Sequence, residues 1–298
     1  LQSLDLSVNK VESLPENIFD KLSALMQLDL YQNKLVSLPA GIFHKLQALT
    51  ALDLTQNKLK ALPAGIFDKL SALEALHLRH NELVDLRAGT FDKLSALSLL
   101  ELTGNRFKTL PEGIFDKLAA KLSALERLDL SDNELVSLPA GIFDKLPALV
   151  RLDLTGNRLE TLPEGIFDEL AGLELLGLRN NLLVSLPAGI FDHLLALHDL
   201  ELGNNKLETL PAGIFDKLSA LQRLNPPEGF FDEEDSPDDR RVLTSSISCG
   251  ETRIYFSRSG GSTIAGSCSA LRAGHRLKTL PAGIFDELAG LESLRLWN

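Results

Sequence analysis

An asparagine recurs every 24 residues along most of this chain, and it lies in nearly the same frame each time. Residues 49–68 show that frame: Leu-x-x-Leu-x-Leu precedes Asn57, and Leu-Pro-x-Gly-Ile-Phe-Asp follows it. A fixed period of this size is typical of a solenoid, in which each unit packs only on its neighbours. The recurring residues are Asn9, Asn33, Asn57, Asn81, Asn105, Asn133, Asn157, Asn181 and Asn205.

Each unit combines a short strand with a return path. The leucines of Leu-x-Leu alternate with period two, so Leu28 and Leu30 are expected in the core and Asp29 on the outside. Strands that recur with the same turn chemistry predict a parallel sheet along one side of an arc. Proline and glycine on the return path favour turns along the opposite side.

The asparagines and phenylalanines of the repeat predict two structural arrays. A polar side chain among leucines costs about 1–3 kcal/mol unless it is hydrogen-bonded, so each amide is expected to bridge the backbone of adjacent turns as a structural ladder. One repeat position always carries phenylalanine, which predicts a stacked aromatic spine near the return path. Its members are Phe19, Phe43, Phe67, Phe91, Phe115, Phe143, Phe167, Phe191 and Phe215.

Charge and composition exclude several functional classes. The net charge of −11 and the pI of about 5.1 argue against nucleic acid, because phosphate binding needs a basic stripe. No run of 18 or more apolar residues is present, so no membrane insertion is expected. The sequence lacks a phosphate-binding glycine loop and a nucleophile arrangement, so neither a catalytic residue nor a cofactor is predicted.

The frame resembles the leucine-rich repeat family, in its typical 24-residue class. Residues 57–76 carry the resemblance through Asn57, Leu59, Leu62, Pro63 and Phe67, and it extends over residues 1–224 and 277–298. The units are similar to those of variable lymphocyte receptors and Toll-like receptor ectodomains. The resemblance implies an α/β-type solenoid: a horseshoe with a parallel concave β-sheet and irregular or 3-10 convex return segments. It also favours an extracellular or cell-surface location and a concave sheet that binds ligands.

The outward strand positions are the expected contact surface. The residue between the two strand leucines is acidic in seven of nine units, as in Asp5 and Glu201; the two exceptions are His77 and Gly177. Two interpretations stay open: a groove for a basic peptide, a basic protein or a cation, and the default solvated face of such repeats. The predicted ligand-binding residues are Asp29, Tyr31, Asp53, His77, Arg79, Glu101, Arg127, Asp129, Arg151, Asp153 and Arg179.

His77 and His80 are close in sequence, and Asp53 and Glu101 are expected on neighbouring strands. Two imidazoles and carboxylates are zinc ligands, but the spacing is accidental to the repeat and no third ligand is fixed. No metal site is therefore predicted.

The repeat is interrupted twice. Asn105 and Asn133 are 28 residues apart, which predicts a four-residue insertion on the return path. The frame then fails over residues 225–276, where an acidic run at 233–239 predicts a loop and Gly260-Gly261 suggests a small hairpin. The predicted domains are a solenoid over 1–224, this irregular insertion, and a degenerate terminal repeat over 277–298.

Cys249 and Cys268 flank the predicted hairpin turn, so they form either a disulfide or two unrelated thiols. The segment 225–276 itself fits a functional island on the solenoid, a tolerated excursion, or a translated non-coding stretch.

The predicted function is non-catalytic recognition of a protein, peptide or glycan on the concave face. Two alternatives remain: a structural protein that self-associates end to end through its open repeats, and the sensor fragment of a larger receptor.

Overall fold

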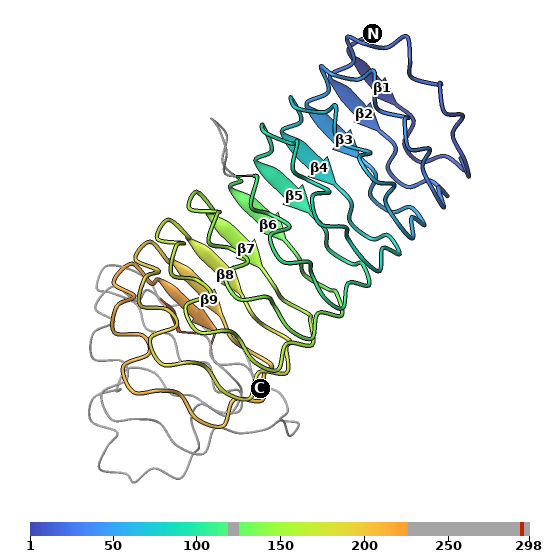
Figure 1. Ribbon diagram of the computed structural model, residues 1–298. Coiled ribbons are helices and arrows are strands. Elements are labelled where there is room, and N and C mark those ends of the chain that lie inside the picture. The colour runs from blue at the N-terminus through green and yellow to red at the C-terminus, as the bar shows by residue number, and fades with distance from the viewer. Residues whose placement is uncertain (119–124, 226–292, 295–298) are drawn as a thin grey trace, which may run out of the picture.

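The computed structural model describes residues 1–118, 125–225 and 293–294, and these residues form a curved solenoid (Figure 1). Its strands form one parallel sheet in which the spatial order follows the chain order. We call the segment that begins with strand βk coil k. The strands are β1 (Ser3–Asp5), β2 (Gln27–Asp29), β3 (Ala51–Asp53), β4 (Ala75–His77), β5 (Leu99–Glu101), β6 (Arg127–Asp129), β7 (Arg151–Asp153), β8 (Leu175–Gly177), β9 (Asp199–Glu201), β10 (Arg223–Asn225) and β11 (Ser293–Leu294).

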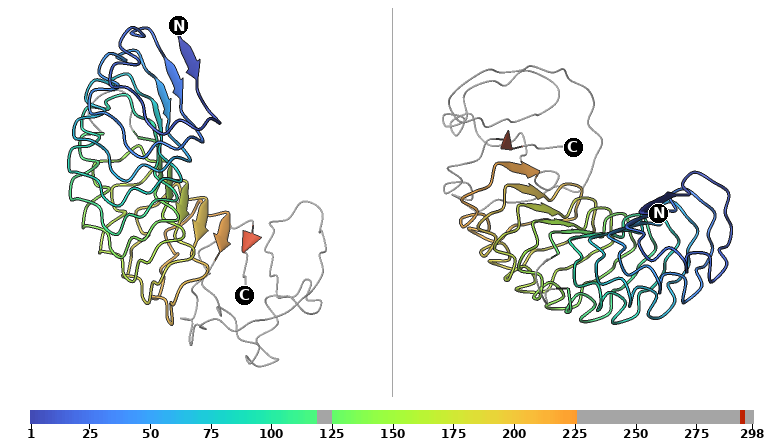
Figure 2. Two further views of the ribbon diagram at one scale, coloured as in Figure 1. Left: turned by 90° about the vertical axis from the view of Figure 1, so that its right-hand side faces the viewer. Right: turned by 90° about the horizontal axis from the view of Figure 1, so that it is seen from above.

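The strands line the inner side of the arc, and the return segments form its outer side (Figure 2). Equivalent leucines face one another in register, so that Leu28 of β2 pairs with Leu4 of β1 and Leu52 of β3. The predicted fold, a solenoid with a parallel concave sheet, is confirmed.

The interior is one continuous apolar cluster. Leu28 is 2% exposed and Leu30 0% exposed, whereas Asp29 between them is half-buried on the concave surface. The phenylalanine rings stack with centroids 6.3–6.5 Å apart, in two runs: Phe43, Phe67, Phe91, Phe115, and then Phe143, Phe167, Phe191, Phe215. Strands in a sheet are only about 4.8 Å apart. The wider spacing on the phenylalanine side therefore bends the stack of coils into an arc.

Successive turns build the outer side. In coil 2, the backbone amide of His44 donates to Gly41 O at 3.0 Å and that of Leu46 to Phe43 O at 3.0 Å, which are three-residue turns. Glycine is required at most of these bends, as at Gly65, because its φ of 67° lies in the left-handed region. The irregular return segments expected from the sequence are thus present.

The asparagine side chains connect neighbouring coils. Asn57 Nδ2 donates to Leu30 O (2.9 Å) in the preceding coil and to Leu54 O (3.1 Å) in its own, and Asn57 Oδ1 accepts from Leu35 N (3.0 Å). The same pattern recurs from Asn33 to Asn205. Asn9, in the first coil, is exposed and donates to Leu6 O and Ser7 O.

The residue before each of these asparagines has left-handed backbone. Two coils place glycine there, Gly104 and Gly156, and the other seven use residues that bear a Cβ. These seven are Val8, Gln32, Gln56, His80, Asp132, Asn180 and Asn204, with φ between 50° and 55°. A β-branched residue such as Val8 is strained in this conformation.

The first interruption of the repeat leaves the sheet in register. Leu100 of β5 pairs with Leu128 of β6 across the 28-residue unit, whose residues 119–124 lie outside the described part. Strand β10 reaches Asn225, one residue beyond the predicted boundary, and pairs with both β9 and β11. Apart from Asn225 and β11, the segments 225–276 and 277–298, with Cys249 and Cys268, lie outside the described residues, so the domain division stays a prediction.

Candidate concave binding surface

Three parallel tracks of side chains cover the concave face. They arise because the residues on either side of each core-facing leucine point away from the core. The first strand residues form the upstream track, which includes Arg127 and Arg151. The third strand residues form the central track, with Asp29, Asp53, His77, Glu101, Asp129 and Asp153. The second residue after each strand forms the downstream track, with Tyr31, Arg79 and Arg179. All eleven predicted residues therefore share one face.

Five aspartates of the central track have a local structural role, and the first is Asp5, whose Oδ1 accepts from Ser7 N at 2.8 Å. The Oδ1 atom of Asp29 accepts a hydrogen bond from the backbone amide of Tyr31, two residues later, at 2.8 Å. The same turn occurs at Asp53, Asp129 and Asp153, at 2.8–2.9 Å. Such a bond lets the side chain hold the backbone turn that follows the strand. The frequent aspartate at this position is thus explained in large part by backbone geometry, which sequence reasoning missed.

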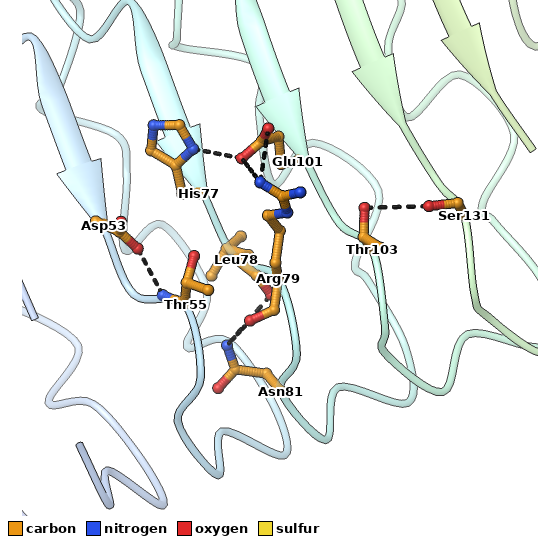
Figure 3. A network of polar contacts seen from close by, with 9 residues as sticks. All are labelled: Asp53, Thr55, His77, Leu78, Arg79, Asn81, Glu101, Thr103 and Ser131. Carbon is orange, nitrogen blue, oxygen red and sulfur yellow. Dashed lines mark hydrogen bonds and ion pairs between the residues drawn. The ribbon is translucent and has the colours of Figure 1, made fainter. Parts of the chain in front are cut away.

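At two positions of the central track that do not carry aspartate, His77 and Glu101, the side chains of adjacent coils contact each other. His77 Nδ1 lies 2.5 Å from Glu101 Oε2, and Arg79 Nη1 lies 3.3 Å from both Glu101 carboxylate oxygens (Figure 3). In the same view Asp53 contacts only the Thr55 amide among the residues drawn. The structure thus brings three of the predicted residues together into one polar cluster on β4 and β5.

The charges in this cluster support one another. The hydrogen bond to Glu101 raises the pKa of His77 above its ordinary 6.5, against the opposing effect of burial. Burial acts to raise the pKa of Glu101, but the contacts with His77 and Arg79 outweigh it and lower that pKa below 4.5. The contact therefore favours the ionised form of both groups over the neutral form. His80 is exposed on the neighbouring turn, and no group of three or more potential metal ligands occurs within the described residues.

The central track lacks a side chain at Gly177, which is buried. A Cβ there would lie 2.5 Å from Asp153 Oδ1 and 2.8 Å from Thr155 Oγ1, so the Asp153 carboxylate leans over the glycine. Glu201 follows on β9. Burial raises the pKa of Asp153, helped by Asp129; burial also raises the pKa of Glu201, helped by Asp199 and Asp153. Two partly desolvated carboxylates therefore lie on either side of Gly177, and one of them covers it.

Arginines add positive charge to the concave face beside the acidic residues. Arg223 donates to Asp199 Oδ2 through Nε (2.9 Å) and Nη2 (2.8 Å), which neutralises the upstream track beside Glu201. Arg127 and Arg151 lie on adjacent strands and are exposed. The described part of the chain contains no helix of the length and apolar character needed to cross a membrane.

The leucine rich repeat profile matches residues 1–59, 48–107, 105–159, 123–183 and 171–225, and the chain belongs to this family. Members of the family commonly act as protein-interaction scaffolds. No curated protein gives a significant match.

Several solved structures are similar to the chain. TLR13, in its complex with ssRNA13, is 24% identical with a TM-score of 0.71, over 99% of this chain and 40% of that one. The leucine-rich repeat domain of APL1B is 25% identical with a TM-score of 0.62, over 76% of this chain and 65% of that one. The Leptospira interrogans LRR protein LIC12759 is 31% identical with a TM-score of 0.47, over 82% and 70%. The chain thus spans less than two thirds of the TLR13 and APL1B chains.

Proposed function

We propose that this protein is a non-catalytic recognition scaffold whose concave face binds a polypeptide that carries cationic side chains. The observation that carries the proposal is the pair of partly buried carboxylates on either side of Gly177, those of Asp153 and Glu201. Both carboxylates have raised pKa values because they are partly buried and repel other acidic groups. A lysine or arginine side chain of the partner that approaches these two carboxylates would relieve that repulsion, which gives the partner's cation a favourable site.

The other predicted contact residues extend this surface. Tyr31, Arg127 and Arg151 are of residue types enriched at binding hot spots, and they stand on the same face. The acidic central track opposes phosphate groups, so the proposal excludes nucleic acid for this chain even though a structural relative is described in complex with RNA. An uncharged glycan would gain nothing from the two carboxylates, which favours a polypeptide.

The proposal is tested with peptides selected from a random displayed library against the intact protein. We expect the selected peptides to be basic. We also expect the Asp153→Asn/Glu201→Gln double variant to bind them at least about tenfold more weakly, since each lost charge removes a partly desolvated ion pair. The Glu164→Gln/Glu169→Gln variant is the matched control, with the same change of charge at exposed positions of a return segment. Equal binding by the wild type and the first variant would contradict the proposal.

A second experiment tests the wider face. Replacing Tyr31, Arg79, Arg127 and Arg151 together by alanine should weaken the binding of the same peptides. The loss should be larger than for the variant in which three exposed convex lysines, Lys69, Lys93 and Lys145, are replaced by alanine. Both sets remove three positive charges, so the comparison separates position from net charge. Full retention of binding by the concave variant would remove these four residues from the surface.

A further inference from the structure

One column of exposed residues alternates between valine and charge along the solenoid. It lies three residues after each ladder asparagine, where the chain leaves the strand side for the convex side. We call it the valine column: Glu12, Val36, Lys60, Val84, Lys108, Val136, Glu160, Val184 and Glu208, in coils 1 to 9. Its four valines are 46–53% exposed, and its charged members are also exposed.

The column is physically continuous. The backbone amide of Val136 donates to Lys108 O at 3.1 Å, and that of Val184 donates to Glu160 O at 3.2 Å. Residues of successive coils are therefore direct neighbours in this column. Valine in every second coil could be inherited from a duplicated two-unit block. Duplication alone does not explain why the intervening charges are lysine in coils 3 and 5 and glutamate in coils 7 and 9.

That division of charge makes the column self-complementary. A two-fold axis through Val136, directed from the concave to the convex side, places coil 5 of one molecule against coil 7 of another. Lys108 then faces Glu160 of the second copy, and Val84 faces Val184 of the second copy. Lys60 likewise faces Glu208 of the second copy, and Val136 meets its own equivalent on the axis. Every position from coil 3 to coil 9 is matched in this single register.

We propose that the valine column is the interface of an antiparallel two-fold dimer of this chain. An isologous interface requires that one surface patch be complementary to itself, which this order of residues satisfies. Two arcs that meet along their side walls run in opposite directions and keep both concave faces open. The inference is independent of the concave-face proposal, because the two rest on different residues.

The columns on either side decide how strong the contact is. Toward the convex side the neighbours are mostly small, with Ala61, Thr109, Ser137 and Thr161, and they permit close approach. Toward the strands, three like-charge contacts would form: Arg106 with Arg158, Lys58 with Lys206, and Glu134 with its own equivalent. The two arginines are each paired within their own chain, with Glu82 at 3.8 Å and with Glu134 at 3.4 Å. Exposed charges interact weakly through water, so these contacts weaken the dimer without cancelling the match within the valine column.

The contact is therefore narrow. Seven coils span about 30–35 Å, given strands roughly 4.8 Å apart and rings 6.3–6.5 Å apart. A strip of this length and one or two side chains wide buries less than the ~1,200 Å² of stable complexes. We expect a weak dimer that forms at high micromolar concentration.

Sedimentation equilibrium of the full chain, over a micromolar to submillimolar range, tests the dimer. The mean mass should rise from 32.6 kDa toward twice that value. Lys108→Glu and Glu160→Lys should each weaken association about tenfold or more, because each places like charges together. The Lys108→Glu/Glu160→Lys double variant should regain wild-type association, since the exchanged pair is again complementary. Val136→Asp should abolish association by facing two carboxylates on the axis.

The control is Lys145→Glu, an exposed change on the convex side that should leave association unaltered. Circular dichroism would verify that each variant is folded, which is expected because every substituted side chain is exposed. A protein that stays monomeric at all concentrations would overturn the proposal. Binding of a different protein to the valine column, in place of a second copy of this chain, would also overturn it. Failure of the double variant to regain association would overturn it as well.

Discussion

His77 Nδ1 on β4 lies 2.5 Å from Glu101 Oε2 on β5, and this contact joins two coils across the concave face. Arg79, two residues after His77 on the same coil, contacts the same carboxylate at 3.3 Å. The contact replaces the local aspartate turn found in most other coils. It makes the stability of this part of the solenoid depend on pH.

Replacing His77 by asparagine should remove that dependence. The raised pKa of His77 means that its contribution is fully present below pH 6.5 and is lost as the pH rises through the folded-state pKa. The lowered pKa of Glu101 means that its contribution is lost as the pH falls through that value, below 4.5. The wild type should therefore exceed His77→Asn in stability by up to about 1 kcal/mol in mildly acidic solution. Urea unfolding at a series of pH values measures the difference, and parallel curves would contradict it.

Glu201→Gln should stabilise the fold at neutral pH. Burial and the acidic neighbours raise the pKa of Glu201, so its charged form opposes folding once the pH rises through that pKa. The neutral amide removes this cost, by an amount on the order of 0.5–1 kcal/mol for a half-buried group. Thermal unfolding at neutral pH and near pH 3 measures it. We expect the gain at neutral pH only; an equal gain at both pH values would point to packing instead.

Asn157→Ala should destabilise the protein by about 2–4 kcal/mol, because it leaves several buried backbone groups without partners. Asn157 is 5% exposed; it donates to Leu130 O and Leu154 O and accepts from Leu135 N, all at 3.0 Å. Asn9→Ala is the control: the side chain is exposed, and water replaces its bonds. Chemical denaturation compares the two. Similar losses of stability would show that the ladder does not stabilise the solenoid.

Val8→Gly should stabilise the first coil. Val8 has a φ of 54° and is 64% exposed, so it has left-handed strain without burial to compensate it. Relief of about 1–2 kcal/mol matches or exceeds the ~0.5–1 kcal/mol entropic cost of glycine, so the net gain is up to about 1.5 kcal/mol. Hydrogen exchange of the Val8 amide, which donates to Tyr31 O, reports the local change. Val36→Gly, at an exposed valine without left-handed backbone, should destabilise instead.

The fold was predictable because each unit repeats the same pattern of core and turn residues. The spacing of Leu28, Leu30 and Asn33 determines which side chains are buried, and a period of 24 residues leaves little freedom in how coils stack. The left-handed position was not predictable, because residues as different as Val8 and Gln56 occupy it. There the stacked neighbours impose the conformation, and the residue itself does not.

The sequence predicted which residues lie on the concave face, but it did not predict the contacts between their side chains. Sequence position placed His77 and Glu101 on it, but the contact between them depends on how far each side chain reaches across one strand spacing. The backbone role of Asp29 was also hidden, although the recurrence of aspartate two residues before a turn was an available signal. From the sequence, Gly177 is only an exception in an acidic series. The structure shows that the Asp153 carboxylate occupies the space that a side chain at this position would need.

Within the described residues, the stacked phenylalanines form two runs, one ending at Phe115 and the other beginning at Phe143. Between them, coils 5 and 6 are joined by strand pairing and by the amide of Asn133. A chain pulled from its ends should yield first at this seam, and its extension should then proceed in two steps, one for each aromatic block.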